Sequence, residues 1–192
     1  MNFVSLDFET ATNYGSSACA IGIGIFEDNL LVDKYYRLIQ PPLNEYMAMN
    51  VRIHGIHPDM TENEPDFAAV WDDIRPLLEG KLVLAHCASF DIGVLRKTLD
   101  YYSLEHPEFD YACTCQIAKK TWPALPGHSL DKVARHLCIT FKHHNALEDA
   151  VACGMIALEA GRMKGLLAVE PLLENLKVKK NDFLPKKRPP SC

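Results

Sequence analysis

The sequence predicts an α/β fold built on a mixed sheet. Three segments with strand character come first, at residues 3–9, 18–26 and 30–39. Segments of helix and strand character then alternate up to residue 160. A strand-rich start followed by such alternation is typical of a layered domain in which helices cover a sheet of parallel and antiparallel strands.

The three opening strands are rich in β-branched and aromatic residues and alternate in polarity over part of their length. The polar residues at 27–29 separate the second strand from the third and predict a hairpin turn. Pro41 and Pro42 end this unit. The region that follows, up to residue 64, has mixed signals and is expected to be a loop with short helix.

Apolar residues recur at helical spacing from residue 67 to residue 78, and Pro65 suits the first position of this helix. Gly80 then stops the helix, and the apolar run at 81–85 predicts a buried strand. Ser129 is a candidate N-cap. The remaining elements are a strand at residues 111–114 and helices at residues 92–102, 116–121, 129–137 and 146–160.

The composition is that of a globular protein, with 48% hydrophobic and 23% charged residues. Residues 1–160 carry 12 basic and 22 acidic side chains, whereas residues 161–192 carry 8 and 3. An acidic body is not the electrostatic footprint of a protein that grips long duplex DNA. The basic, proline-containing end is interpreted as a solvated tail, with a contact to nucleic acid or to a partner protein as the alternative.

The lack of a recognisable export signal or membrane span, together with the cysteine usage, predicts a cytoplasmic protein with no membrane partner. The first residues contain no basic region followed by an apolar run, and no apolar stretch approaches the roughly 18–20 residues of a membrane span. The seven cysteines are odd in number and scattered, as expected for reduced thiols. Cys113 and Cys115 with His128 or Cys138 match no common zinc spacing, so no zinc site is expected there.

Asp7 and Glu9 lie two residues apart on the first strand, so both side chains project from the same face. Two adjacent carboxylates on a nearly buried strand repel each other, and one would take up a proton unless a cation compensates them. A divalent cation is the natural compensation. Alternatively, the strand runs out into solvent, where the two charges cost nothing.

Asp91 opens one predicted helix, and Asp149 lies near the start of the last one. Asp91 shares the inward face of its helix with Leu95 and Leu99, although an acid at a helix N-terminus is favourable in itself. Asp149 lies on the apolar face of the last helix, where a charged group needs a partner. His144 precedes this helix closely enough to reach the same site.

The last helix also has a candidate capping box. Asn145 can cap its N-terminus, and Glu148 stands at the third helical position, from which it can reach back to the cap. This arrangement gives Glu148 a structural role and leaves Asp149 free for another.

Four carboxylates and one histidine suit metal-dependent hydrolysis of a phosphodiester. Two hard cations about 3.5–4 Å apart can clamp the attacking and leaving oxygens of an in-line displacement. Mg²⁺ prefers carboxylate, water and phosphate oxygens. A histidine can accept the proton of the attacking water near neutral pH. The sequence contains no glycine-rich phosphate loop that would favour an NTPase.

The three segments D-F-E-T, H-C-A-S-F-D and H-N-A-L-E-D-A together resemble the DEDDh 3′–5′ exonucleases, a family that includes the proofreading (epsilon) subunit of bacterial DNA polymerase III. The resemblance covers about residues 2–160. It implies a ribonuclease-H-like fold with a five-stranded mixed sheet flanked by helices. The exonuclease domain would span residues 1–165, followed by the basic tail at residues 166–192.

The resemblance also implies roles for individual residues. Two Mg²⁺ or Mn²⁺ ions would be held by Asp7, Glu9, Asp91 and Asp149, and His144 would be the general base. The pocket for the terminal nucleotide would be lined by Phe8, Thr10 and His54. Cys87 stands where the family often has asparagine.

The function expected from this resemblance is removal of nucleoside monophosphates from the 3′ end of DNA, in proofreading or repair. Single-stranded DNA or frayed 3′ ends would be the substrate, and a DNA polymerase is the candidate partner. One alternative is an RNA-trimming exoribonuclease, because tolerance of the 2′-hydroxyl cannot be deduced from sequence. Another is a non-catalytic module that binds a polymerase, although such a module has no need of all five residues.

Overall fold

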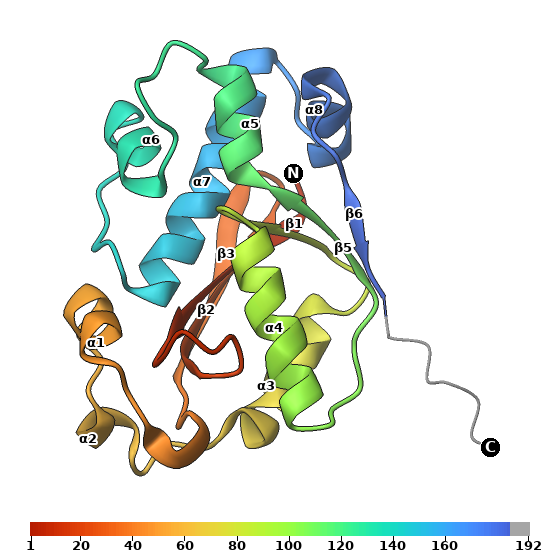
Figure 1. Cartoon of the computed structure of the whole chain (residues 1–192). Coiled ribbons are helices and arrows are strands. Elements are labelled where there is room, and N and C mark those ends of the chain that lie inside the picture. The colour runs from red at the N-terminus through yellow and green to blue at the C-terminus, as the bar shows by residue number, and fades with distance from the viewer. Residues whose placement is uncertain (185–192) are drawn as a thin grey trace.

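The computed structural model describes residues 1–184. Its centre is a six-stranded mixed sheet with helices on both faces (Figure 1). The order of strands across the sheet is β3-β2-β1-β4-β5-β6. The central strand β1 pairs antiparallel with β2 and parallel with β4. The strands are β1 (Phe3–Thr10), β2 (Ala18–Glu27), β3 (Leu30–Leu38), β4 (Leu82–Ala85), β5 (Phe109–Cys113) and β6 (Asn181–Phe183).

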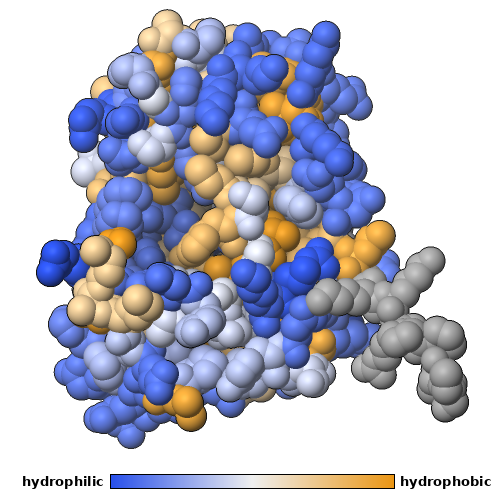
Figure 2. All heavy atoms as spheres, viewed as in Figure 1, coloured by the Kyte–Doolittle hydropathy of each residue, from blue (hydrophilic) through white to orange (hydrophobic). Residues whose placement is uncertain are grey.

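Hydrophobic clusters on the two faces of the sheet hold the helices in place. The cluster on one face includes residues of α3 and α4, and the cluster on the other includes residues of α5, α6, α7 and α8. Hydrophilic side chains cover much of the outer surface in the view of Figure 2. The helices are η1 (Pro42–Asn44), α1 (Ala48–His54), α2 (Pro58–Thr61), α3 (Phe67–Leu78), α4 (Ser89–Tyr101), α5 (Thr114–Thr121), α6 (Leu130–His136), α7 (Ala146–Lys164) and α8 (Val169–Leu176).

The alternation of side chains along β1 decides which face carries the acids. Val4, Leu6 and Phe8 belong to the cluster beneath α3 and α4. Asp7 and Glu9 therefore project from the opposite face, which α7 covers. This confirms the face predicted for the two carboxylates.

Helix α7 approaches the sheet closely because β2 has a glycine at the contact. A Cβ atom at Gly22 would lie 2.1 Å from the carbonyl oxygen of Ala146, the first residue of α7. Gly22 pairs with Asp7 across the β1–β2 ladder. The missing side chain therefore brings the N-terminus of α7 onto the same part of the sheet as Asp7.

Replacing Gly22 with alanine should destabilise the protein by about 1–3 kcal/mol, because the new methyl group must displace the backbone of α7. Gly93 is the matched control. It lies inside α4, and a Cβ atom there would meet nothing within 4 Å. Gly93→Ala should therefore stabilise the protein by up to about 1 kcal/mol. Urea unfolding measures both changes, and equal effects would contradict the close approach of α7.

The sheet has one strand more than the five expected from sequence. β6 pairs antiparallel with β5, and Phe183 stacks on Phe109 with ring centroids 4.6 Å apart. Helix α8 and strand β6 lie in the segment expected to be a tail, so the folded body extends past residue 165. A strand of three residues is too short to give a recognisable alternation. The rest of the expected tail, residues 185–192, lies outside the described residues.

The expected start of α3 was wrong, and the expected cap of α6 is confirmed in its position only. Helix α3 begins after Asp66, whose carboxylate accepts the backbone N–H of Ala69 at 2.9 Å, so Pro65 precedes the helix. Ser129 occupies the N-cap position of α6, but its hydroxyl donates to Asp131 instead of capping the helix. Within residues 1–184, no helix combines the length and the apolar character that crossing a membrane requires.

Candidate active site

The first two acids of the site lie at the end of β1. Glu9 is 8% exposed, and Asp7 is partly exposed at the base of a pocket. β4 pairs with β1 only at Val4 and Ser5, so the end of β1 has no neighbouring strand on that side. The acids of β1 therefore border an opening in the sheet surface that other side chains can enter.

Asp91 enters this opening from the first turn of α4. One of its carboxylate oxygens accepts the backbone N–H of Phe8 at 3.0 Å. This contact joins positions 83 residues apart and satisfies a donor that β4 does not reach. Asp91 is 1% exposed, so its charge is almost entirely removed from bulk water.

Asp149 comes from the opposite side, in the first turn of α7. Its carboxylate accepts the backbone N–H of His144 at 3.1 Å and contacts Nδ1 of His143 at 3.1 Å. Asn145 caps the helix by accepting the N–H of Glu148. Glu148 does not reach back to the cap as expected, because its carboxylate accepts the N–H of Lys142 instead. The loop at residues 142–145 is thus held to the first turn of α7 by hydrogen bonds at both of its ends, which fixes the position of Asp149.

The acids lie close enough to share a cation. Carboxylate oxygens of Asp7, Glu9 and Asp149 all lie within 4.8 Å of one another. Among the residues that the structure describes, the ion pairs of these acids include His143 but no lysine or arginine. Oxygen ligands without a permanent positive partner are the donor set that Mg²⁺ or Mn²⁺ prefers. The cluster therefore fits divalent cations.

The electrostatic cost of this cluster appears in its pKa values. Burial, reinforced by Asp149, raises the pKa of Glu9 to about 8. Burial also raises the pKa of Asp91 to about 8, although the hydrogen bond from Phe8 opposes it. The pKa of Asp7 is well above its usual value because of burial and the charges of Asp91, Asp149 and Glu9. Metal binding must therefore displace protons from these carboxylates near neutral pH.

The metal-free protein should lose stability as the pH rises through the site's raised pKa values. Glu9 has a pKa of about 8 when folded against 4.5 as a free side chain, so the folded state binds its proton more tightly. This contribution is complete below about pH 4.5 and disappears as the pH passes about 8. Melting temperatures in EDTA should therefore fall between about pH 5 and pH 9, and Mg²⁺ should restore them most at high pH.

Glu9→Gln is the control for this pH dependence, because it removes one titrating group without changing the shape of the side chain. The variant should show a shallower fall of melting temperature in EDTA. A melting temperature that rises with pH in the metal-free original protein would contradict the raised pKa values.

A cavity of about 510 Å³ opens over the acids. The predicted pocket residues Thr10 and His54 line it. The two ring nitrogens of His54 are both engaged, since Nδ1 accepts the N–H of Ile56 and Nε2 therefore donates to the carbonyl of Thr10. Burial lowers the pKa of His54. Its imidazole is thus held neutral and in a fixed orientation at the wall of the cavity.

Phe8 also lines the cavity, as predicted, but its ring is buried in the core. The ring is 2% exposed and packs at 6.4 Å from the ring of Phe67 in the core. Phe8 reaches the cavity side through its backbone, which donates to Asp91. The exposed aromatic rings at the cavity are those of Tyr14 and Phe90, which sequence analysis had not selected.

His143, which was set aside in favour of His144 as the predicted base, also belongs to the site. Its imidazole contacts Asp149, whereas the predicted base His144 contacts Asp149 through its backbone N–H. The two rings stack with centroids 3.9 Å apart, and both line the cavity. His144 has a left-handed φ of 63°, which turns the chain before α7. The doubled histidine was visible in the sequence, but spacing alone pointed to His144.

Residues 4–156 match the protein family described as Exonuclease (RNase_T). This match covers most of the chain, including β1, the start of α4 and the start of α7. The chain belongs to this exonuclease family. The resemblance to DEDDh exonucleases found in the sequence is thereby confirmed at the level of the family.

Curated relatives of this exonuclease-family chain are much longer proteins. The DNA polymerase III PolC-type of Thermotoga petrophila is 32% identical over 180 residues, which are 91% of this chain and 13% of that protein. The 3′-5′ exonuclease DinG of Bacillus subtilis is 27% identical over 161 residues, which are 82% of this chain and 17% of that protein. The chain thus spans less than a fifth of the length of either relative.

Solved structures confirm the ribonuclease-H-like arrangement of this exonuclease-family fold. A structure of Exonuclease X in complex with 5′ overhanging duplex DNA has a TM-score of 0.72 at 21% identity, covering 90% of this chain and 98% of that one. The nuclease domain of 3′hExo, described as a DEDDh family member bound to rAMP, has a TM-score of 0.72 at 14% identity, covering 95% and 97%. At these identities the likeness concerns the fold.

Proposed function

We propose that this chain is a metal-dependent 3′–5′ exonuclease that releases nucleoside monophosphates from the 3′ end of DNA. The observation that carries the proposal is the meeting of Asp7, Glu9 and Asp149 at one cavity, with Asp91 buried beside them. Four acids from three separate elements are costly to bring together, as their raised pKa values show. Binding of cations offsets that cost and gives the cluster a use.

Asp7, Glu9, Asp91 and Asp149 would hold two Mg²⁺ or Mn²⁺ ions. When bound, such ions polarise the phosphate and stabilise the charge that develops on the attacking and leaving oxygens. His144 would accept the proton of the attacking water. Burial and the neighbouring His143 lower the pKa of His144, so its imidazole is neutral and able to accept that proton near neutral pH.

The cavity supports attack on the end of a chain. Thr10 and His54 form a wall on the β1 side, and exposed Tyr14 and Phe90 offer rings to which a base can stack. A volume of about 510 Å³ suits one or two nucleotides and not a long duplex. Single-stranded or frayed 3′ ends are therefore the substrates we propose, in proofreading or repair.

The polymerase connection rests on the named relatives. The PolC-type protein of Thermotoga petrophila is a DNA polymerase III of which this chain matches a small part. We therefore propose a DNA polymerase as the partner to test first.

The direct test is a time course on 5′-labelled single-stranded DNA and RNA of the same sequence, with Mg²⁺, Mn²⁺ or EDTA. The Asp7→Ala variant, purified in the same way, controls for contaminating nucleases. A metal-dependent ladder that starts from the 3′ end of DNA, absent in the variant, supports the proposal. A ladder mainly on RNA would replace DNA by RNA as the substrate. Folded protein without any ladder would favour a non-catalytic module.

A further inference from the structure

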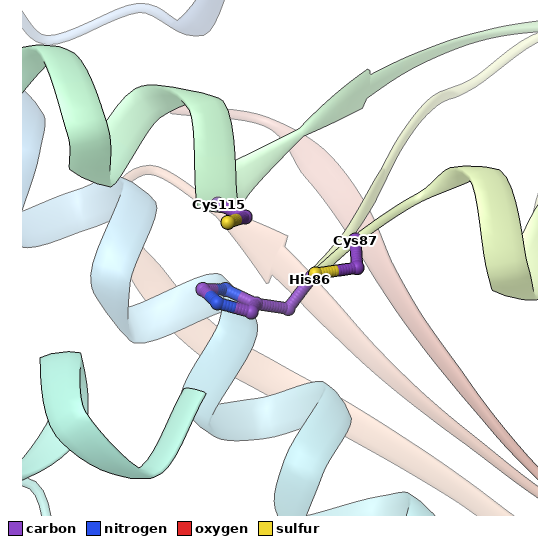
Figure 3. Close-up of side chains that lie close together, drawn as sticks. All are labelled: His86, Cys87 and Cys115. Carbon is purple, nitrogen blue, oxygen red and sulfur yellow. The ribbon is translucent and has the colours of Figure 1, made fainter. Parts of the chain in front are cut away.

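A cluster of sulfur and nitrogen donors lies next to the catalytic acids but takes no part in the proposed hydrolysis. His86 and Cys87 occupy the turn between β4 and α4, and Cys115 lies at the start of α5 (Figure 3). One donor atom of each residue lies within 4.8 Å of the donor atoms of the other two. The three side chains come from two elements that follow neighbouring parallel strands, β4 and β5.

The hydrogen bonds of His86 prepare it to be a metal ligand. Nε2 lies 2.8 Å from the carbonyl oxygen of His128, which only accepts, so this nitrogen carries the proton. Nδ1 then presents its lone pair, which accepts the hydroxyl of Thr114 at 3.0 Å. Histidines that bind metals commonly donate their second ring N–H to a backbone carbonyl in this way.

The Thr114 hydroxyl can give up its hydrogen bond to His86 Nδ1 and still have a hydrogen-bond partner. The hydroxyl also lies 3.1 Å from the sulfur of Cys153 and 3.4 Å from the carbonyl oxygen of Ala85. A neutral imidazole with an available lone pair is the form that binds a metal.

A fourth sulfur stands beside the three donors. Cys113 ends β5, two residues before Cys115. Thiolate is the form of cysteine that binds metals, so this sulfur can add a further ligand to the cluster.

The cluster is accessible from outside. Cys87 is exposed and lines the same cavity as the catalytic acids, while His86 and Cys115 are 9% and 7% exposed. Soft thiolates and imidazole select Zn²⁺ and similar cations, whereas the neighbouring carboxylates select Mg²⁺ or Mn²⁺. The two adjacent donor sets therefore differ in the class of metal that they prefer.

We propose that His86, Cys87 and Cys115, with Cys113 beside them, form a binding site for a thiophilic cation of the Zn²⁺ class, separate from the catalytic acids. Binding releases the thiol protons of Cys87 and Cys115 and places the lone pair of His86 Nδ1 on the cation. The occupied site joins the turn before α4 to the start of α5. The pattern was missed in the sequence because Cys87 and Cys115 are 28 residues apart, and Cys115 was considered only together with Cys113 and either His128 or Cys138.

The test is a Co²⁺ titration of the reduced 192-residue chain in excess Mg²⁺, so that the carboxylates are occupied by the hard cation. Thiolate-to-cobalt charge transfer in the near ultraviolet reports sulfur ligands only. One equivalent of Co²⁺ should produce this absorption, and Zn²⁺ should abolish it. Circular dichroism of each variant checks folding, and Zn²⁺ should raise the melting temperature of the original protein.

Cys87→Ser and Cys115→Ser should each weaken Co²⁺ binding at least about 100-fold. Cys138→Ser is the matched control, because Cys138 is exposed and lies outside the cluster. Cys87 is itself exposed, so its variant should fold even if Cys115→Ser does not. Absence of charge transfer in the original protein would overturn the proposal. Unchanged charge transfer in folded Cys87→Ser would overturn it equally.

Discussion

Asp149→Asn is expected to lower kcat at least about a thousandfold while leaving the metal-free protein as stable as the original or more so. Loss of one carboxylate ligand removes several kcal/mol of transition-state stabilisation by the cations. The same change relieves repulsion, because Asp149 is one of the causes that raise the pKa of Asp7 and of Glu9. Asparagine keeps an oxygen that can accept the N–H of His144.

Opposite effects on activity and on stability separate a ligand from a purely structural acid. Initial rates on single-stranded DNA and melting curves in EDTA measure the two quantities on the same preparations. Asp72→Asn, on the exposed face of α3, removes one negative charge far from the cluster and should change neither quantity. If Asp149→Asn unfolds at a clearly lower temperature in EDTA, the acid is needed mainly for the fold.

Local periodicity in the sequence was sufficient to predict the elements that carry these acids. Alternation along β1 predicted that Asp7 and Glu9 share a face, and the structure agrees because Val4 and Leu6 fill the core on the other side. The cap at Asn145 was also predictable, since its side chain accepts an N–H three residues further on. These signals depend on neighbours in the chain.

Features that depend on contacts between distant segments were not predictable. Asp91 gains its partner from the backbone of Phe8, 83 residues away. β6 was missed because its three residues become a strand only through pairing with β5. Such features require the fold before they can be recognised.

The two histidines before α7 offer a test in which neighbouring residues should behave differently. His144→Gln is expected to lower kcat by about 10²–10⁴-fold with little change in metal affinity, because it removes the proposed general base. His143→Gln should lower kcat far less. It removes the imidazole contact with Asp149, so its main effect should be on the protonation of that carboxylate and on metal affinity.

The pH dependence of kcat distinguishes these roles further. His143 is one of the causes that lower the pKa of His144, so His143→Gln should raise that pKa. A base with a higher pKa becomes protonated at higher pH, and the acid limb of the rate profile should therefore move upward in this variant. In His144→Gln the limb due to this base should disappear. If His143→Gln is instead the variant that loses both turnover and the acid limb of the rate profile, His143 is the base. Its position is compatible with that role, because its Nδ1 lies 3.1 Å from the Asp149 carboxylate.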